Sequence, residues 1–520
     1  MSATDRASNS LRNARYATLF YMVGLVAAFF FRRYFIQVLG DELLGLNSTL
    51  VSILGFLNIA ELGLSSAVAF ALYQPLAQND RQQVSEIISI QAWFYRWVAR
   101  IVLVASGILL LFFPLIFKDK GIPLWYAYAT YVVLLFNALW GYLFNFRQII
   151  FSSDQQEYKM TLAIQLPRVL KQVLQILAIL YLPAPYIWWL GIEFLFGVVG
   201  ALFIEWLIHK DYPWLKANAK QGNRVRSNYP EIIRRTKQLF YHKIATFVLQ
   251  QSTPIIIFAV FASAQGLTIV TIYQNYLVIY AGISGVIYAI FNGLTASVGN
   301  LITEGDNNRV EVVFRKLYAL RLWIALVISA GMLWYSQGFM ELWIGGGRSF
   351  QQIDLLLFVL YMLLQLSRLP DQFIYAYGMY QDIYAPMIEA ILNLGLSILL
   401  GSMWGITGIL LGINISLIVV IYGWKPYFLY SRAFKKSVWG YHLRQGAELL
   451  LVVGAGWALS YFLPSITSFS STPSWLGWLK TAVSGTCLFA LISSILLYLL
   501  HPDFRQGIAM LISKIHRKHT

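Results

Sequence analysis

Apolar windows of about 20 residues recur along the whole chain, and this repetition restricts the fold more than any other feature of the sequence. A window of this length crosses the roughly 30 Å hydrocarbon layer of a membrane as an α-helix. Charged residues make up only 12% of the 520 residues, whereas soluble domains carry about 25%. The sequence therefore predicts an all-α membrane protein in which the helical bundle is itself the domain.

The windows predict about 14 transmembrane helices. An even number places both termini on one side of the membrane, and most Lys and Arg residues fall in segments on that side. By the positive-inside rule, both termini are cytoplasmic. This asymmetry accounts for the net charge of +16 without a nucleic-acid partner, and no RNA-binding motif accompanies it. The predicted spans are 17–39, 46–73, 89–116, 123–147, 161–182, 185–208, 238–261, 268–296, 316–338, 353–376, 384–402, 404–424, 446–464 and 479–500.

Two halves of the chain show similar motifs in the same order. Gly63–Val68 at the end of the second predicted span matches Gly293–Val298 at the end of the eighth. The loops that follow, Asn79–Val84 and Gly305–Val310, also match. Two six-helix units with one orientation form parallel repeats, an arrangement typical of transporters that alternate between two open states. The predicted domains are an N-terminal lobe (1–208), a basic cytoplasmic linker (209–237), a C-terminal lobe (238–424), and helices 13 and 14 with a cytoplasmic tail (425–520).

Basic side chains occur inside the predicted spans, where each costs at least about 2.5–3.5 kcal/mol. The simplest explanation is a water-filled cavity that receives a negatively charged group. Arginine offers a planar fork for phosphate, and lysine offers a point charge. The candidate substrate-binding residues of this cationic cavity are Arg32, Arg33, Arg96, Arg100, Arg168, Lys171, Lys243, Arg321 and Arg368.

Depth separates these cations into two groups. Arg168 and Lys171 lie near the middle of their span and share one helix face, because they are three residues apart. They are too deep to reach the interface, which favours the cavity. For Arg96, Arg321 and Arg368, snorkelling to the cytoplasmic interface is an equally good explanation. Ion pairing with a buried carboxylate is a third explanation for these cations.

Glu61 and Glu193 are the candidate ion-coupling residues, with H⁺ or Na⁺ as the coupling ion. A salt bridge to one of the buried cations is the competing explanation for each of them, and Asp371 and Glu389 are further candidate partners. The six histidines show no ligand spacing, so the sequence predicts neither a metal site nor a cofactor.

Several motifs resemble the multidrug/oligosaccharidyl-lipid/polysaccharide exporter (MOP) superfamily, above all its Wzx-type flippases. The resemblance spans roughly residues 14–424 and implies two six-helix lobes around a central cavity. Two positions depart from the family pattern: Pro254 follows Ser252-Thr253 where an Asp often stands, and Ile413 follows Gly412 in place of Thr. If that Asp serves ion coupling in the family, the resemblance implies that coupling in this chain uses another residue or differs. The motifs are Phe291–Leu301, Phe314–Leu317, Glu341–Gly345, Ala385–Asn393 and Gly405–Gly412.

The resemblance implies a flippase, not an enzyme. Its substrate would be an undecaprenyl-pyrophosphate-linked oligosaccharide for lipopolysaccharide O-antigen or capsule, moved across the bacterial inner membrane by alternating access. Candidate protein partners are the polysaccharide polymerase and chain-length proteins. Three alternatives stay open: a cation-coupled multidrug exporter, which would favour acidic cavity residues; a membrane-embedded glycan polymerase or ligase, which would need a large external loop; and a structural scaffold, which would need no buried charges.

Overall fold

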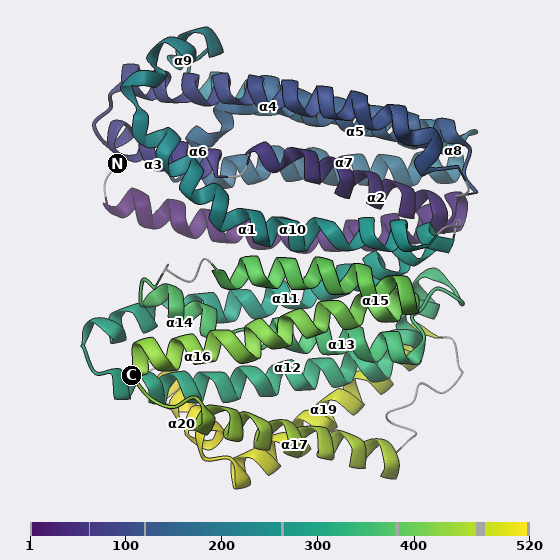
Figure 1. The fold of residues 1–520 in the computed structure, drawn as a ribbon, viewed down its shortest axis with the longest axis vertical. Helices are drawn as coiled ribbons and strands as arrows, with labels where there is room; N and C mark the ends of the chain where they lie inside the picture. Colours follow the sequence, from purple (N-terminus) through teal and green to yellow (C-terminus); the bar gives the residue numbers. More distant parts are fainter. Residues whose placement is uncertain are drawn as a thin grey trace. The chain divides into compact units, whose positions relative to one another are not determined.

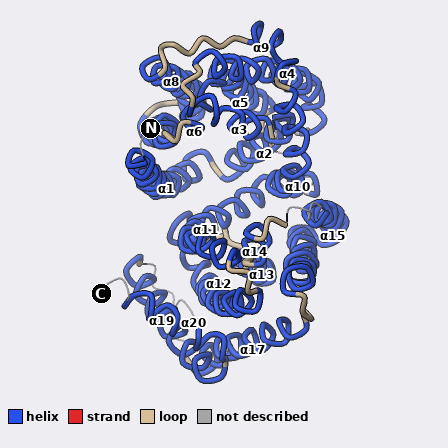
Figure 2. Tube along the Cα trace, turned by 90° about the vertical axis from the view of Figure 1, so that its left-hand side faces the viewer, coloured by secondary structure: helices blue, strands red, loops and turns tan. Residues whose placement is uncertain are grey.

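The computed structural model of the protein describes residues 3–61, 63–118, 121–261, 265–379, 384–463 and 474–516, and the regular structure in these ranges is helical (Figures 1 and 2). Eleven helical stretches in the described ranges are long and apolar enough to cross a membrane. One of them, Tyr384–Phe434, holds two predicted spans, because its helical geometry breaks at Trp404 and Gly405. The predicted all-α, multi-pass membrane fold is therefore confirmed.

The chain forms two compact units, Met1–Gln274 and Asn275–Thr520. Helix α11 (Gln265–Thr303) runs across the boundary between them. In the first unit, α1 packs against α7, α7 against α8, and α4 against α5. Its helices are α1 (Ala3–Leu39), α2 (Asp41–Leu57), α3 (Leu64–Ala77), α4 (Arg81–Ile116), α5 (Leu124–Phe144), α6 (Ile149–Ser153), α7 (Glu157–Tyr181), α8 (Pro185–Asp211), α9 (Ala219–Val225) and α10 (Pro230–Val260).

The second unit is built around α12 (Asn307–Ile344), which is buried along most of its length. Two bonds tie it to the C-terminal helices: Trp323 donates to the hydroxyl of Ser493 (3.0 Å), and Gln445 donates to that of Tyr318 (2.7 Å). The helices beyond the predicted repeats are thus part of this unit's core. Its other helices are α13 (Gln352–Leu366), α14 (Pro370–Ala376), α15 (Tyr384–Leu417), α16 (Lys425–Leu429), α17 (Trp439–Phe462), α19 (Trp475–Leu500) and α20 (Pro502–His516).

The matching loops of the predicted repeat begin equivalent helices. The Asp80 carboxylate accepts a hydrogen bond from the backbone N–H of Gln83 (2.9 Å) and caps α4. The Asp306 carboxylate accepts one from the backbone N–H of Arg309 (3.1 Å) and caps α12. A carboxylate at this position satisfies backbone donors that have no partner within the helix, which explains why both loops carry Asp.

The second predicted span, 46–73, is not one helix. It is divided between α2 and α3, with a short 3₁₀ turn at Asn58–Glu61 between them. Gly63 adopts a φ of +89°, and a Cβ there would lie 2.8 Å from the carbonyl oxygen of Thr236 in α10. The break therefore depends on close approach to a distant helix, whereas the matching motif Gly293–Val298 lies within the continuous helix α11.

Helix α10 lies in the first unit, where it packs against α2 and α3. The C-terminal lobe predicted from the sequence begins at residue 238, whereas the first packing unit extends to Gln274 and includes this helix. The difference arises because hydrophobic spacing identifies spans without showing which neighbours they contact.

The two segments of α15 approach each other closely at glycines. Gly405 has a φ of +60°, a conformation that favours glycine, and it reverses the chain between the segments. A Cβ on Gly408 would collide with the backbone of Leu400, and one on Gly412 would lie 2.6 Å from the backbone nitrogen of Ser397. These glycines explain the motif Gly405–Gly412.

Gly408→Val is expected to lower the thermal midpoint of unfolding, because the added side chain forces the two segments apart. Overpacking of this kind costs about 1–3 kcal/mol or more. The matched control is Gly395→Val on the same helix, because a Cβ at Gly395 meets nothing within 4 Å. Thermal unfolding of both variants in detergent checks the expectation, and equal midpoints would contradict it.

Candidate functional site

Helix α7 carries a polar stripe along one face, although it is among the membrane-spanning candidates. Arg168 is the exposed charge of this stripe, while Gln172 and Gln175 beside it are buried. The ion pairs formed by the described residues do not include Arg168. A cation without a counter-ion within a membrane helix is costly unless water or an anion reaches it. The stripe recurs at spacings of three and four residues and consists of Thr161, Gln165, Arg168, Gln172 and Gln175.

Lys171 has a different environment from Arg168. Its Nζ lies 2.7 Å from Oε1 of Glu193 in α8, with the two side chains 22% and 16% exposed. Gln175 donates to the other carboxylate oxygen of Glu193 at 3.0 Å. The structure thus brings a predicted substrate-binding cation together with a predicted coupling carboxylate, and the pair stabilises the contact between α7 and α8.

The remaining predicted cations of α1 and α4 are spread over the first unit. Arg32 and Arg33 are half-buried near the end of α1. Arg96 and Arg100 are exposed on α4, and the guanidinium of Arg100 lies 5.2 Å from the ring centroid of Trp97. The face of this aromatic ring stabilises the charge of Arg100.

Glu61 and Lys243 do not pair with each other. The hydroxyl of Tyr95 donates to Oε1 of Glu61 at 2.6 Å, and that of Ser65 donates to it at 3.4 Å. Lys243 is exposed and donates to the hydroxyl of Ser66 at 2.6 Å. The groups that donate to Glu61 among the described residues are hydroxyls, so the structure does not support an ion pair as the explanation for this carboxylate.

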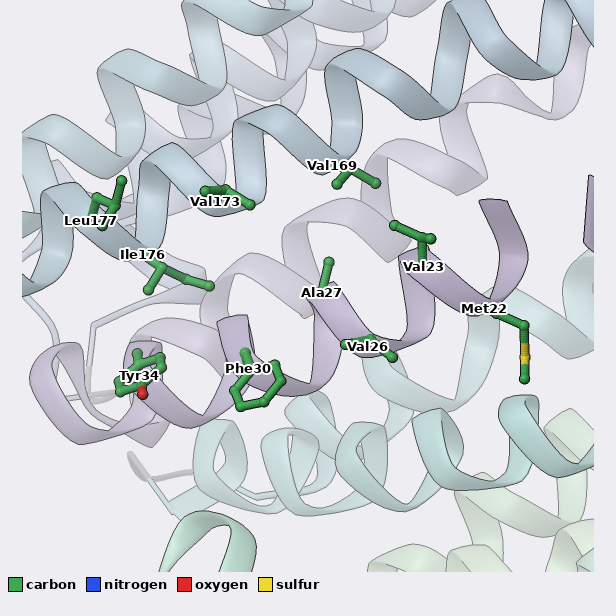
Figure 3. Close-up of a pocket in the computed structure, with 10 residues that line it drawn as sticks. All are labelled: Met22, Val23, Val26, Ala27, Phe30, Tyr34, Val169, Val173, Ile176 and Leu177. Atoms are coloured by element: carbon green, nitrogen blue, oxygen red, sulfur yellow. The ribbon is translucent and has the colours of Figure 1, made fainter. Parts of the chain in front are cut away.

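An apolar groove of about 560 Å³ lies between α1 and α7 (Figure 3). Val23, Ala27 and Phe30 point into it from α1, and Val169 and Val173 lie along the α7 side. By helical spacing, these α7 positions lie on a different face from the polar stripe. Helix α7 therefore presents a polar face with Arg168 and an apolar face that borders a groove.

In the second unit, Arg368 belongs to a buried ion network. Its Nε pairs with Asp371, and its Nη2 lies 3.5 Å from Oε2 of Glu389. Lys425 in α16 lies 3.2 Å from the other oxygen of Asp371. Two cations and two carboxylates give this network no net charge, so ion pairing explains Arg368 better than an open anion site.

Arg321 is the most buried of the predicted cations, with 1% of its surface exposed. Its Nε donates to the carbonyl of Leu366 at 2.7 Å. The guanidinium lies 4.8 Å from the ring centroid of Phe291 and 5.9 Å from that of Tyr288. Both Nη atoms lack a hydrogen-bond partner among the described residues. Aromatic faces stabilise this charge in place of a carboxylate.

Sequence reasoning missed two parts of these clusters. Lys425 falls just outside the predicted spans, yet its side chain is only 5% exposed and pairs with Asp371. The glutamines of the α7 stripe were not singled out, although their spacing around Arg168 was readable from the sequence. No sequence signal identifies Lys425, because its burial depends on a helix about 50 residues away along the chain.

No protein-family model and no curated protein matches the sequence. Solved structures do match. The inward closed lipid II flippase MurJ has a TM-score of 0.65 at 16% identity, with 92% of this chain and 99% of that chain covered. An inward-facing multidrug resistance MATE family transporter of the MOP superfamily has a TM-score of 0.58 at 16% identity, with 79% of this chain and 96% of that chain covered.

The chain therefore has the fold of these transporters, and the resemblance predicted from the sequence is confirmed at the level of the fold. Both solved proteins move molecules across membranes, according to their descriptions, and neither is described as an enzyme. One moves a lipid and the other moves drugs, so the shared fold alone does not choose a substrate.

Proposed function

We propose that this protein is a flippase for polyprenyl-pyrophosphate-linked oligosaccharides. In this proposal it lies in the bacterial inner membrane with both termini cytoplasmic and supplies units for O-antigen or capsule synthesis. The polysaccharide polymerase and chain-length proteins are its proposed partners. Support comes from the fold shared with a lipid flippase, from the positive-inside charge distribution, and from the polar and apolar faces of α7.

The observation that carries the proposal is Arg168, an exposed cation without an acidic partner among the described residues. An arginine fork matches a phosphate group in geometry and charge. Gln165 lies one helical turn away on the same face and is half-buried, and its amide suits the hydroxyl groups of a glycan. A pyrophosphate bound at Arg168 would place a sugar beside Gln165.

The groove between α1 and α7 gives the lipid portion of the substrate a place to lie. Its lining residues are apolar along both helices, apart from the hydroxyl of Tyr34. A polyprenyl chain in this groove would keep its contacts with hydrocarbon while the head group occupied the polar face. One helix would then contact both halves of an amphipathic substrate.

A cation-coupled multidrug exporter is the competing function, because a MATE transporter shares the fold. The charge at Arg168 argues against it, since a cation repels cationic drugs. Glu61 stays the candidate coupling residue for H⁺ or Na⁺, because Glu193 is paired with Lys171. Protonation or Na⁺ binding at Glu61 would act on a carboxylate that already accepts bonds from Tyr95 and Ser65.

Depletion of the protein in its host tests the proposal. We expect the lipid-linked oligosaccharide to accumulate on the cytoplasmic leaflet, because its synthesis continues while its export stops. Leaflet-specific labelling of the glycan measures this in inverted and right-side-out vesicles. Accumulation on the outer leaflet would instead indicate a defect in polymerisation or ligation, and the flippase assignment would be wrong.

A further inference from the structure

The basic linker between α8 and α10 is ordered and packs against the N-terminal part of α4. Helix α9 packs against α4 so closely that a Cβ on Gly222 would collide with the carbonyl of Ser89. The hydroxyl of Ser89 accepts from the backbone N–H of Asn218 at 3.1 Å, and the hydroxyl of Tyr229 donates to Glu86 at 2.7 Å. These contacts fix the face of the linker that packs against α4, which we call its inner face. The opposite, outer face is held in place with it.

The outer face is positively charged. Residues 209–237 contain eight Lys or Arg and two acidic residues, which gives a net charge of +6. Both acids are already paired, Asp211 with Lys159 at 2.8 Å and Glu231 with Arg234 at 2.9 Å. Several further cations of the linker are exposed and form no ion pair among the described residues. Three of them lie in α9 or within three residues of its start, and we call them the α9 cations: Lys216, Lys220 and Arg224.

Aromatic side chains lie beside neighbouring cations at this end of the first unit. The guanidinium of Arg226 lies 4.3 Å from the ring centroid of Trp93, and that of Arg81 lies 5.5 Å from Trp214. Trp206, with 55% of its surface exposed, lies 5.2 Å from Nζ of Lys210. Tryptophans concentrate at the depth of the lipid head groups. The α9 cations thus belong to a segment held at the membrane interface.

We propose that the α9 cations bind the head groups of anionic phospholipids in the leaflet that borders the linker. Clusters of Lys and Arg next to a membrane helix attract anionic lipids. The contacts with α4 hold the segment that carries the α9 cations in place. The positive-inside rule explains why the linker is basic, but it does not require exposed cations fixed on an ordered helix. This inference does not depend on the proposed transport function.

The test uses the full-length protein in detergent micelles, titrated with phosphatidylglycerol or phosphatidylcholine and analysed by native mass spectrometry. The variant combines Lys216→Gln, Lys220→Gln and Arg224→Gln. We expect its affinity for phosphatidylglycerol to fall roughly 100-fold, because each basic residue near an anionic surface contributes about a fivefold change. Affinity for phosphatidylcholine should not change.

A second triple variant removes the same charge elsewhere and serves as the control: Arg432→Gln, Lys435→Gln and Lys480→Gln, all at exposed positions. It should retain the affinity for phosphatidylglycerol. Equal loss in both variants, or no loss in either, would overturn the proposal. Competition by inorganic pyrophosphate at the same concentration as the lipid would also overturn it, because the site would then recognise soluble phosphates. Unfolding temperatures of both variants confirm that each is folded.

Discussion

Asp371→Asn should lower the free energy of unfolding by about 3 kcal/mol, because it leaves buried Lys425 and partly buried Arg368 with one carboxylate. Removing one member of a buried ion pair typically costs about 3–5 kcal/mol. Asp371 contacts both Arg368 and Lys425, and Lys425 is 5% exposed. The lower end of the range applies because Glu389 still lies 3.5 Å from Arg368.

Denaturant titration in detergent measures this loss, with Asp354→Asn as the control. Asp354 is also buried, but it accepts a hydrogen bond from the hydroxyl of Thr407 at 2.5 Å. An asparagine retains an acceptor for that bond. Equal losses for the two substitutions would contradict the ion network as the source of stability.

Neutralising Arg168 and Lys171 together should abolish surface glycan while the protein still inserts into the membrane. The structure predicts that the two substitutions act differently, one on substrate binding and the other on stability. Arg168→Gln removes the proposed phosphate contact, and a charge-assisted bond of about 1.5–3 kcal/mol corresponds to roughly a 10- to 100-fold loss of transport. Lys171→Gln leaves the Glu193 carboxylate without its cation at 2.7 Å and should chiefly lower stability.

Two further variants distinguish binding from stability. Lys171→Gln combined with Glu193→Gln removes both charges of the pair and should restore much of the stability that Lys171→Gln loses. Arg432→Gln, which removes an exposed cation outside the candidate cavity, should leave transport near the wild-type rate. Surface glycan and the amount of protein in the membrane are measured for each variant. Normal surface glycan in Arg168→Gln would remove Arg168 from the mechanism.

The helices could be predicted from the sequence because their signals are local. Hydrophobic length identified the spans, although α4 and α12 begin about two turns before the predicted starts at residues 89 and 316, where Asp80 and Asp306 cap them. The break at Gly63 could not be predicted, because it results from contact with α10. Tertiary contacts of this kind leave no trace in helical spacing.

The sequence indicated which residues could form the candidate site, but not which contacts each of them makes. Spacing placed Arg168 and Lys171 on one helix face, yet one is exposed and the other pairs with Glu193. Both residues are cationic and lie at similar depths in the span, so only the contact of Lys171 with Glu193 in α8 distinguishes them. Arg368 was assigned to the same cavity, although its two carboxylate partners bring it into a neutral network.

Transfer of a polyprenyl-pyrophosphate-linked oligosaccharide between the leaflets of proteoliposomes measures whether the protein alone flips this substrate. The purified protein is reconstituted with substrate in both leaflets, and a membrane-impermeant glycan-cleaving enzyme reports how much becomes accessible over time. We predict that the wild-type protein exposes the protected half, while Arg168→Gln and protein-free liposomes expose little of it. Protection that persists with the folded wild-type protein, together with uptake of a cationic drug, would contradict the account.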